Sequence, residues 1–417
     1  MKKKLILSVV MALLLALPLI SGCAAPREEV VPPEGEKYIT WLDLTDFTGP
    51  IGGLTTANEM GLIDYLKDIN EKGGVDGVKV NLIPIDTRYD MARGISAYHM
   101  YSGEHNLLIV DAANTGLSKI LLPLVEEKGQ ITGGPADGEW QANPGRGFLW
   151  FPCYQDGFAA MVDFVLEDWE KKGNTGTPTI AHITMDSAYG RESQNGGAQY
   201  AELKGVKMLT PEYYPSGSAQ FEPYLAKLTD ADYIHIGGVD PVPSLILRDA
   251  HAMGLTDDIQ FICDFYGPAE HVGATEYPEA TNGAWFYCPF LRGELGQNHP
   301  VLKRLWETYQ GTSSSEMISG YAIGVLRGLD LTAALKVALD EVGYENLSGD
   351  ALFAGYESLG GSDSRQGLTG LCSFSPTSRR GTEYLRFYRL ENGKEIAMTD
   401  WVQIPLNPSA VDLYYGK

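Results

Sequence analysis

Apolar and polar positions along the chain switch repeatedly between two periods. Residues 38–44 alternate as a strand does, whereas Leu62, Tyr65, Leu66 and Ile69 recur at the spacing of one helix face. A strand places successive side chains on opposite faces, while a helix brings residues three and four apart onto one face. The pattern therefore predicts a strand followed by an amphipathic helix.

Three glycines separate this helix from the next predicted strand. Gly73 and Gly74 follow the last apolar helix position, as a left-handed helix end requires. Gly77 permits a turn, and residues 78–85 form the next strand. Pro84 lacks a backbone N–H, which predicts a sheet edge or the end of the strand.

The same alternation continues to residue 263. Predicted strands cover residues 107–110, 130–132, 179–185, 206–209, 233–236 and 259–263, and predicted helices cover residues 117–127, 156–171, 193–203, 221–228 and 242–253. This order is typical of a parallel, doubly wound α/β sheet, and a break near residues 150–157 predicts two such lobes. Residues 300–342 are mainly helical, and residues 371–405 are strand-like with a turn at residues 391–394.

The N-terminus predicts export. Residues 2–4 are lysines, residues 5–20 are apolar and uncharged, and Cys23 follows two small residues. Such a short apolar run is typical of a signal peptide, and the cysteine fits a bacterial lipoprotein signal. We expect residues 1–22 to be removed, Cys23 to be lipidated and the polar residues 23–37 to act as a tether. An ordinary signal peptide with an incidental cysteine is the alternative.

Composition narrows the classes of function. The chain has 417 residues, 44% of them hydrophobic, which is enough to bury the cores of two domains or lobes. A net charge of -22 disfavours a nucleic-acid binder, which would carry a basic surface. The cysteines at 153, 263, 288 and 372 form no close sequence pair, so we predict no zinc site. Their spacing leaves free thiols and disulfides both open.

Catalytic motifs are missing from the sequence. It contains no phosphate-binding loop, no dinucleotide-binding glycine pattern after a strand and no nucleophile elbow. Its seven histidines form no metal-binding pair, and we expect His182 and His235, inside predicted strands, to be packed core residues. We therefore predict a protein that is not an enzyme, with no catalytic residue, cofactor or metal.

Polar loops follow the predicted strands. In an open parallel sheet, ligands bind beyond the carboxyl ends of the strands. The loops at those ends are residues 111–116, 133–138, 186–190, 237–240 and 264–267. Asn114 and Thr115 either hold an anion at a helix N-terminus or only cap that helix. Tyr189 either contacts a ligand or stabilises a turn, and Asp240 and Asp264 either pair with an ammonium group or face solvent.

Several segments resemble a known family. Residues 48–50, the helix end at 69–71, residues 73–77 and a strand closing on Asp86 look like the opening of periplasmic binding proteins of the branched-chain amino acid type. Further similarities, in the order found in the family, lie at residues 186–190, 231–238, 248–255, 369–374 and 388–394. Members of this family are the extracytoplasmic solute receptors of ABC importers.

The resemblance implies the type I periplasmic binding protein fold, with two doubly wound, parallel-sheet α/β lobes joined by a hinge. Lobe 1 would comprise residues 38–155 and 286–370, and lobe 2 would comprise residues 156–285 and 371–417. A ligand would dock on lobe 1, and lobe 2 would close over it without any chemical change.

On lobe 1, the resemblance places recognition of a ligand carboxylate at Thr115, beside Asn114. The next loop would supply further contacts near Ala136, Asp137 and Gly138. Gly138 lacks the hydroxyl that the family has at this position. The resemblance therefore leaves specificity for amino acids open.

On lobe 2, the family tyrosine falls at Tyr189, and a second, often aromatic, position falls at Val239, next to Asp240. The carboxylate that pairs with a ligand's ammonium group falls at Asp264 or Phe265. If Phe265 takes this place, the ligand needs no amine, and an aromatic or aliphatic carboxylate becomes the better match.

The implied partners are a small ligand and an ABC permease in the membrane. The ligand would be an amino acid, an aromatic or aliphatic carboxylate, or a related amide. The protein would be a monomer that meets the membrane only through its lipid. Two other functions stay open: a sensory ligand-binding domain, and an exported hydrolase. The hydrolase needs a nucleophile–base pair or a metal cluster, which the sequence does not show.

Overall fold

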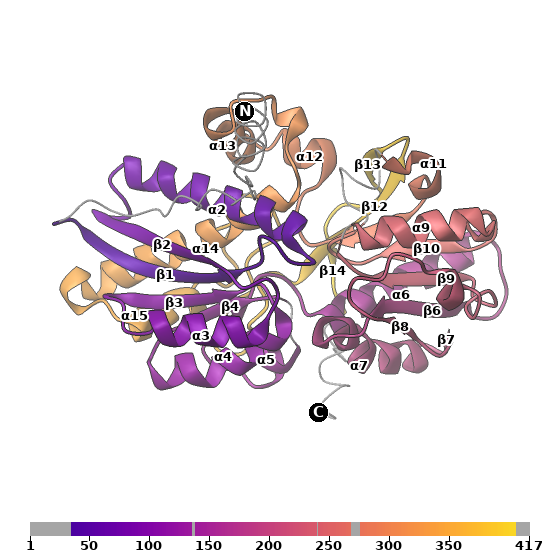
Figure 1. Ribbon diagram of the computed structural model, residues 1–417, viewed down its shortest axis with the longest axis horizontal. Coiled ribbons are helices and arrows are strands. Elements are labelled where there is room, and N and C mark those ends of the chain that lie inside the picture. Colours follow the sequence, from indigo (N-terminus) through magenta and orange to yellow (C-terminus); the bar gives the residue numbers. More distant parts are fainter. Residues whose placement is uncertain (1–34, 136–137, 240, 268–275, 406–417) are drawn as a thin grey trace, which may run out of the picture.

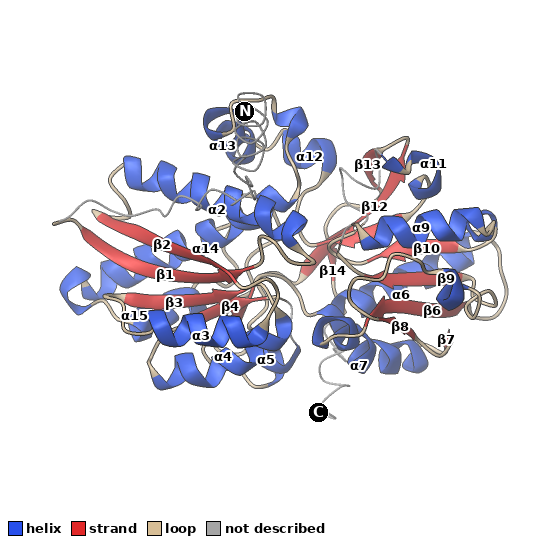
Figure 2. Ribbon diagram, viewed as in Figure 1, coloured by secondary structure: helices blue, strands red, loops and turns tan. Residues whose placement is uncertain are grey.

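Two α/β lobes lie side by side in the computed structural model, which describes residues 35–135, 138–239, 241–267 and 276–405 (Figure 1). In each lobe a sheet is covered by helices (Figure 2). The elements of the first lobe are β1 (Lys37–Thr45), α2 (Gly52–Glu71), β2 (Val78–Asp86), α3 (Met91–Tyr101), β3 (Leu107–Ala112), α4 (Thr115–Glu127), β4 (Thr132–Gly134), α5 (Gly138–Ala142), β5 (Gly147–Leu149), α13 (Pro300–Tyr309), α14 (Gly320–Val342) and α15 (Gly349–Glu357).

The second lobe takes its elements from the middle and the end of the chain. They are α6 (Tyr154–Lys171), β6 (Thr179–Met185), α7 (Ala188–Leu203), β7 (Lys207–Met208), β8 (Glu212–Tyr214), α8 (Glu222–Leu225), β9 (Tyr233–Gly237), α9 (Val242–Ala252), β10 (Gln260–Cys263), α11 (Pro278–Thr281), β11 (Trp285–Cys288), β12 (Tyr384–Glu391), β13 (Lys394–Ala397) and β14 (Val402–Gln403). The short helix α12 (Gly293–Gln297) lies on the connection back to the first lobe.

The sheet of the first lobe is parallel. Its strands run in the order β2-β1-β3, and β4 pairs with β5. A parallel bridge between Ile109 and Ile131 joins β3 to the segment before β4, which extends the order to β2-β1-β3-β4-β5. This is a doubly wound order, because the chain runs outward from β1 in both directions. The edge position of β2 agrees with the prediction from Pro84.

The sheet of the second lobe is mixed. Its main path is β13-β12-β11-β10-β9-β6-β7, with β8 beside β6 and β14 beside β12. Strands β6 to β11 pair in parallel, whereas β12 pairs antiparallel with β11, β13 and β14. The strand-like end of the chain therefore adds an antiparallel edge to the predicted parallel sheet. The expected lobe boundary between residues 285 and 286 falls inside β11, so we place this boundary after Cys288.

Helix α14 joins the first lobe through direct backbone contact with α2. A Cβ atom at Gly61 would lie 2.0 Å from the carbonyl oxygen of Tyr321, and one at Gly324 would lie 1.8 Å from that of Asn58. Only glycine permits helices to approach this closely. Residues 320–331 are all buried, and this stretch is apolar apart from Arg327 and Asp330.

The predicted glycine turn after α2 is confirmed. Gly73, Gly74 and Gly77 have φ angles of 99°, 80° and 84°. A Cβ atom at Gly74 would also lie 2.2 Å from the carbonyl oxygen of Val78. The turn thus returns the chain into the sheet and belongs to the scaffold.

The buried histidines and cysteines are structural. The Nδ1 atoms of His182 and His235 lie 2.7 Å apart, and His235 Nε2 lies 2.9 Å from the hydroxyl of Tyr287. Burial lowers the pKa of His182 to about 4. The prediction of packed core histidines is therefore confirmed. The cysteines at 153, 263, 288 and 372 are buried and form no disulfide with one another.

The chain crosses from one lobe to the other in three passages. The first lies between β5 and α6, the second between β11 and α13, and the third between α15 and β12. Hydrogen bonds join the first and third passages: the N–H of Leu149 donates to the oxygen of Arg379 (2.8 Å), and that of Gly381 donates to the oxygen of Phe151 (3.4 Å). Within the described part of the chain, no helix has the length and apolar character needed to cross a membrane.

Candidate functional site

A cavity between the lobes contains several predicted binding residues. It encloses about 480 Å³ of atom-free space, counted with the part that is open to solvent. The first lobe and the first passage contribute Ile51, Leu54, Thr55, Asn58, Tyr89, Ala113, Thr115, Pro135, Trp150 and Ile323. The second lobe contributes Tyr154, Met185, Tyr189, Val239 and Tyr266. None of these wall residues has a charged side chain.

Strand ends explain why these residues meet. Tyr89 follows β2, and Thr115 follows β3. On the second lobe, Tyr189 follows β6, Val239 follows β9 and Tyr266 follows β10. Parallel strands bring their carboxyl ends to one edge of a sheet, where ligands bind in open α/β folds. The cavity lies between the two edges that this rule selects.

Thr115 and Asn114 have different roles at the start of α4. The Asn114 side chain accepts a hydrogen bond from the backbone N–H of Leu117 (3.0 Å) and donates one to the backbone carbonyl oxygen of Tyr89 (3.3 Å). Thr115 is 2% exposed and lines the cavity. Its hydroxyl has no hydrogen-bond partner among the described residues. Asn114 is therefore a helix cap, whereas Thr115 offers an unused donor at the wall.

Asp264 lies directly behind Tyr189. The Tyr189 hydroxyl donates to the Asp264 carboxyl group, and the N–H of Tyr266 donates to it at 3.3 Å. Asp264 is 3% exposed and does not form part of the cavity wall. Burial raises the pKa of Asp264 to about 7, although hydrogen bonds from Tyr189 and from the N–H groups of Tyr266 and Gly238 lower it. Tyr189 thus stands between this acid and the cavity.

Phe265, the other residue considered for this position, lies in the core of the second lobe. Its side chain is fully buried, and its ring lies 5.4 Å from that of Tyr287 and 6.1 Å from that of Phe151. It is not part of the cavity wall. Of the two alternatives, only Asp264 contacts a wall residue through a polar group.

Two of the other predicted site residues lie within the described part of the chain, and the rest lie outside it. Val239 lines the cavity, and Gly138 begins helix α5. Ala136, Asp137 and Asp240 lie outside the described residues, as does the predicted lipidation site at Cys23.

The sequence did not predict Tyr89 as a wall residue. Arg88 and Tyr89 have positive φ angles of 55° and 59°, which are uncommon outside glycine. The carboxylate of Asp86 accepts the N–H of Arg88 (3.1 Å) and so supports this turn. Residues 48–50, one of the segments that resemble the family, pack against this turn. A Cβ atom at Gly49 would lie only 2.8 Å from the carbonyl carbon of Arg88. The sequence signal that could have identified Tyr89 as a wall residue is its position shortly after the predicted strand at residues 78–85.

Two further aromatic wall residues, Trp150 and Tyr154, also escaped prediction. They lie in and just after the first passage between the lobes, where no strand end or motif marks them. The Tyr154 hydroxyl donates to that of Tyr266 (3.3 Å), and the rings of Tyr154 and Tyr189 meet edge to face at 5.0 Å. These contacts make the second lobe's side of the cavity an aromatic wall.

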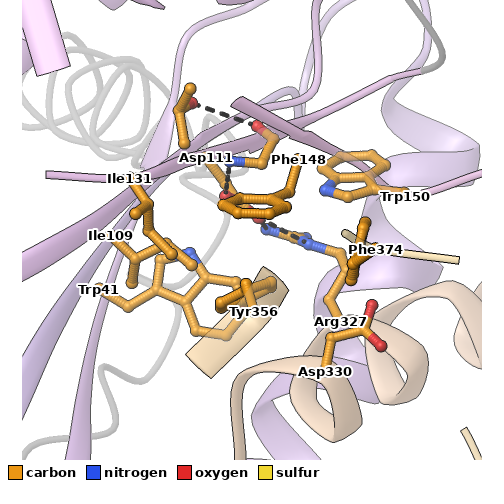
Figure 3. A pocket seen from close by; sticks show the side chains of 12 residues that line it. Trp41, Ile109, Asp111, Ile131, Phe148, Trp150, Arg327, Asp330, Tyr356 and Phe374 are labelled. Carbon is orange, nitrogen blue, oxygen red and sulfur yellow. Dashed lines mark hydrogen bonds and ion pairs between the residues drawn. The ribbon is translucent and has the colours of Figure 1, made fainter. Parts of the chain in front are cut away.

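A buried ion cluster around Arg327 contacts the cavity wall. Figure 3 shows Arg327 with Asp111 and Trp150 in another pocket, which shares Trp150 with the cavity. Arg327 Nη2 lies 2.7 Å from Asp43 Oδ2 and 2.9 Å from Asp111 Oδ2. The same guanidinium donates to the Asn58 side chain (3.2 Å) and lies 4.5 Å from the ring of Trp150. Burial raises the pKa of Asp111 to about 6, and the charge of Arg327 opposes this. Because Asn58 and Trp150 line the cavity, Arg327 positions part of its wall.

Other parts of the described chain lack a metal-binding group but include a second hollow. They contain no group of three or more His, Cys, Asp or Glu side chains that could hold a metal ion. A second hollow, with about 1480 Å³ of atom-free space including open solvent, lies between α12, α14 and β13. It contains none of the predicted site residues, and its Arg292 is paired with Glu395.

Two α/β lobes that enclose a cavity at their strand ends define a two-lobed binding protein. Residues 44–395 match the periplasmic binding protein family, and the chain belongs to that family. Its members are binding proteins and not enzymes. This agrees with the predicted family resemblance and with the prediction that the protein is not an enzyme.

Comparisons with individual proteins agree with this assignment. The chain is 23% identical over 234 residues to a leucine-, isoleucine-, valine-, threonine- and alanine-binding protein of Pseudomonas aeruginosa, covering 55% of this chain and 59% of the relative. A branched-chain amino acid ABC transporter structure from Thermus thermophilus with bound valine is similar at a TM-score of 0.80 and 17% identity, covering 92% of this chain and all of that one. A fatty acid ABC transporter substrate-binding protein from Thermomonospora curvata is similar at a TM-score of 0.77 and 17% identity, covering 89% and 94%.

Proposed function

We propose that the protein is the extracytoplasmic, lipid-anchored solute receptor of an ABC importer. It binds a small amino acid or carboxylate-type ligand between its lobes and passes it to a membrane permease. The cavity with walls from both lobes is the observation that carries the proposal, because a ligand there contacts both halves at once.

Binding and closure are linked through these contacts. Thr115 and Tyr89 belong to the first lobe, whereas Tyr189, Val239 and Tyr266 belong to the second. A ligand that touches both sets gains more from closed lobes than from open ones, and only this difference can shift the equilibrium. The permease would then distinguish the closed, loaded receptor from the open one.

Thermal unfolding and X-ray scattering of the full chain test this proposal. We expect a true ligand at about 100 times its Kd to add about 2.7 kcal/mol to the free energy of unfolding. The same ligand should reduce the radius of gyration and should be recovered chemically intact. Steady conversion of the ligand, with no change in scattering, would instead support a hydrolase.

The anchor is a separate part of the proposal. The apolar run before Cys23 and the polar segment up to residue 37 support export and tethering. We expect the wild-type protein to fractionate with membranes and its Cys23→Ser variant to be released from them. Mass spectrometry of the mature N-terminus should find lipid on Cys23. An unmodified N-terminus cleaved elsewhere would show an ordinary signal peptide.

The remaining choice lies between import and sensing. A monomer in solution and a neighbouring permease gene would support the importer. A chain that binds ligand normally but whose deletion leaves uptake unchanged would support a sensory role.

A further inference from the structure

We propose that Asn58 selects the ligand, because its side-chain amide donates a hydrogen bond to an uncharged oxygen of the molecule bound between the lobes. The ligand carries this oxygen, as a hydroxyl, carbonyl or ether, on the part that lies against α2. This inference rests on the proposed function and specifies the class of ligand.

Asn58 is a polar residue in a mainly apolar part of the cavity wall. It lies on α2, lines the cavity and is 3% exposed. The same part of the wall contains Ile51, Leu54 and Ile323. Thr55, the other polar wall residue of α2, already donates its hydroxyl to the backbone carbonyl oxygen of Ile51 (3.0 Å).

Arg327 determines which way the Asn58 amide faces. Arg327 Nη1 donates to Asn58 Oδ1 (3.2 Å). A guanidinium group has five donors and no acceptor, so only the oxygen of the amide can face it. The amide nitrogen therefore faces away from Arg327, and it has no hydrogen-bond partner among the described residues. Because Asn58 lines the cavity, this nitrogen is the atom that it offers to a ligand.

The Arg327 guanidinium is itself held in place. Its Nη2 atom lies 2.7 Å from Asp43 and 2.9 Å from Asp111, and its central carbon lies 5.2 Å from the ring of Trp41 and 4.5 Å from that of Trp150. The orientation of the Asn58 amide is thus set before a ligand arrives, as in other preorganised binding sites.

Charges around Arg327 favour an uncharged oxygen over a second carboxylate. The single positive charge of Arg327 faces the carboxylates of Asp43, Asp111 and Glu59, the last at 3.9 Å. A further carboxylate beside Asn58 would add to this excess of negative charge, and like charges repel strongly in a medium of low dielectric constant. A neutral oxygen accepts the same hydrogen bond without that cost.

Closure of the lobes makes this hydrogen bond selective. In an open cavity, water can accept from the Asn58 amide, whereas a ligand in the closed cavity displaces that water. A hydrocarbon group at this point would leave a buried donor unpaired, which costs more free energy than a hydrogen bond normally contributes. For the same reason, sites that bind a polar group of their ligand strongly reject the analogue that lacks it.

Ligands of matched size test this inference by calorimetry on the full chain. Valine and threonine differ by a methyl group in place of a hydroxyl. In a second set, 4-methylpentanoate carries a methyl group, 4-oxopentanoate a carbonyl oxygen and butanedioate a charged carboxylate at the same end. We expect threonine or 4-oxopentanoate to bind at least about tenfold more tightly than its hydrocarbon analogue, and 4-oxopentanoate to bind more tightly than butanedioate.

Hydrocarbon analogues that bind as tightly as both oxygen-bearing compounds overturn the inference but leave the receptor function intact. Butanedioate that matches 4-oxopentanoate also overturns it, because the oxygen would then not need to be uncharged. Failure of all five compounds to shift either the calorimetric signal or the unfolding temperature would overturn the inference and count against the proposed function as well.

Variants of Asn58 provide a second, independent measurement. Asn58→Leu removes the donor and should lose about tenfold in affinity for the oxygen-bearing ligand, while its affinity for the hydrocarbon analogue stays the same or rises. Asn58→Asp keeps an oxygen against Arg327 but turns a second acceptor toward the cavity. It should therefore lose affinity for 4-oxopentanoate, whose carbonyl group can only accept. Equal losses for both members of a pair in Asn58→Leu would show a merely structural role and contradict the inference.

Asn70→Leu is the matched control on the same helix. The Asn70 amide donates to the backbone oxygen of Val80 (2.9 Å) and accepts the N–H of Val80 (3.0 Å). Its loss should lower the unfolding temperature but leave the preference between the two members of each pair unchanged. The same change of preference in Asn58→Leu and Asn70→Leu would refute recognition by Asn58.

Discussion

Lys119 Nζ, on α4 of the first lobe, lies 2.5 Å from Glu192 Oε1, on α7 of the second. The other oxygen of Glu192 accepts a hydrogen bond from the Gln155 side chain (2.6 Å). The Glu192 side chain is only 4% exposed, whereas that of Lys119 is 28% exposed. Lys119 and Glu192 lie one helical turn beyond Thr115 and Tyr189. The ion pair therefore joins the lobes beside the cavity.

Removal of this ion pair should shift the lobes toward an open arrangement. We expect Lys119→Met to weaken ligand binding by about 1–3 kcal/mol, because a charged hydrogen bond of the closed state is lost. Scattering should also show a larger radius of gyration without ligand. Lys204→Met is the matched control, because Lys204 pairs with Asp163 (2.9 Å) inside the second lobe. Equal effects of the two variants would contradict a role in closure.

The buried carboxyl group of Asp264 should give the protein a specific pH dependence. Its pKa rises from 3.8 to about 7 in the folded protein, mainly through burial. Its contribution to stability is therefore fully present below pH 3.8 and is lost as the pH rises through about 7. Asp264→Asn cannot ionise. Relative to wild type, this variant should gain up to about 1.4 kcal/mol of unfolding free energy per pH unit in this window.

Denaturant unfolding of both proteins from pH 4.5 to pH 8.5, in roughly half-unit steps, measures this difference. The gap between the curves should widen up to about pH 7 and then stay constant. Curves that run parallel over the whole range would show that Asp264 is ionised in the folded protein throughout.

Loss of the Arg327 guanidinium should strongly destabilise the first lobe. We expect Arg327→Met to cost about 3–5 kcal/mol, because Asp43 and Asp111 would be left as buried carboxylates without their cation. Arg304 is a suitable control, since its side chain is 46% exposed and pairs with Asp68. Arg304→Met should cost about 1 kcal/mol or less. Similar losses in the two variants would argue against the importance of burial.

The contact between α2 and α14 should not tolerate a single added methyl group. A Cβ atom at Gly324 would lie 1.8 Å from the oxygen of Asn58, so Gly324→Ala must push the helices apart. We expect a loss of more than about 2 kcal/mol, as for other strained core substitutions. Gly53→Ala, also in a helix but with nothing within 4 Å, should be neutral or stabilise by up to about 1 kcal/mol. A tolerated Gly324→Ala would refute direct backbone contact in solution.

Strand ends were the part of the site that the sequence could predict. Thr115, Tyr189 and Val239 line one cavity, and the sequence pointed to them because periodicity located β3, β6 and β9 and polar loops follow those strands. The same periodicity predicted α2, its glycine stop and the doubly wound order. These features depend on local spacing, which a single sequence displays directly.

Features that depend on distant contacts were not predictable in this way. Trp150 lines the cavity because the first passage between the lobes runs past it, and no local pattern marks that path. Arg327 lies in a mainly apolar stretch whose pattern predicts only a helix. Its partners Asp43 and Asp111 lie more than 200 positions earlier, so no local pattern links them to Arg327. Helix α3 was missed because only Gly94, Ala97 and Tyr98 are buried along it.

The place of α14 in the first lobe also bears on how the protein is made. Its partner α2 ends at Glu71, whereas α14 begins at Gly320, after all the parallel strands of the second lobe. As the chain leaves the ribosome or crosses the membrane, the face of α2 that α14 covers stays uncovered until the late segment arrives. The earliest lobe to start folding is thus completed late, and a chain interrupted before residue 320 would expose that face to chaperones and proteases.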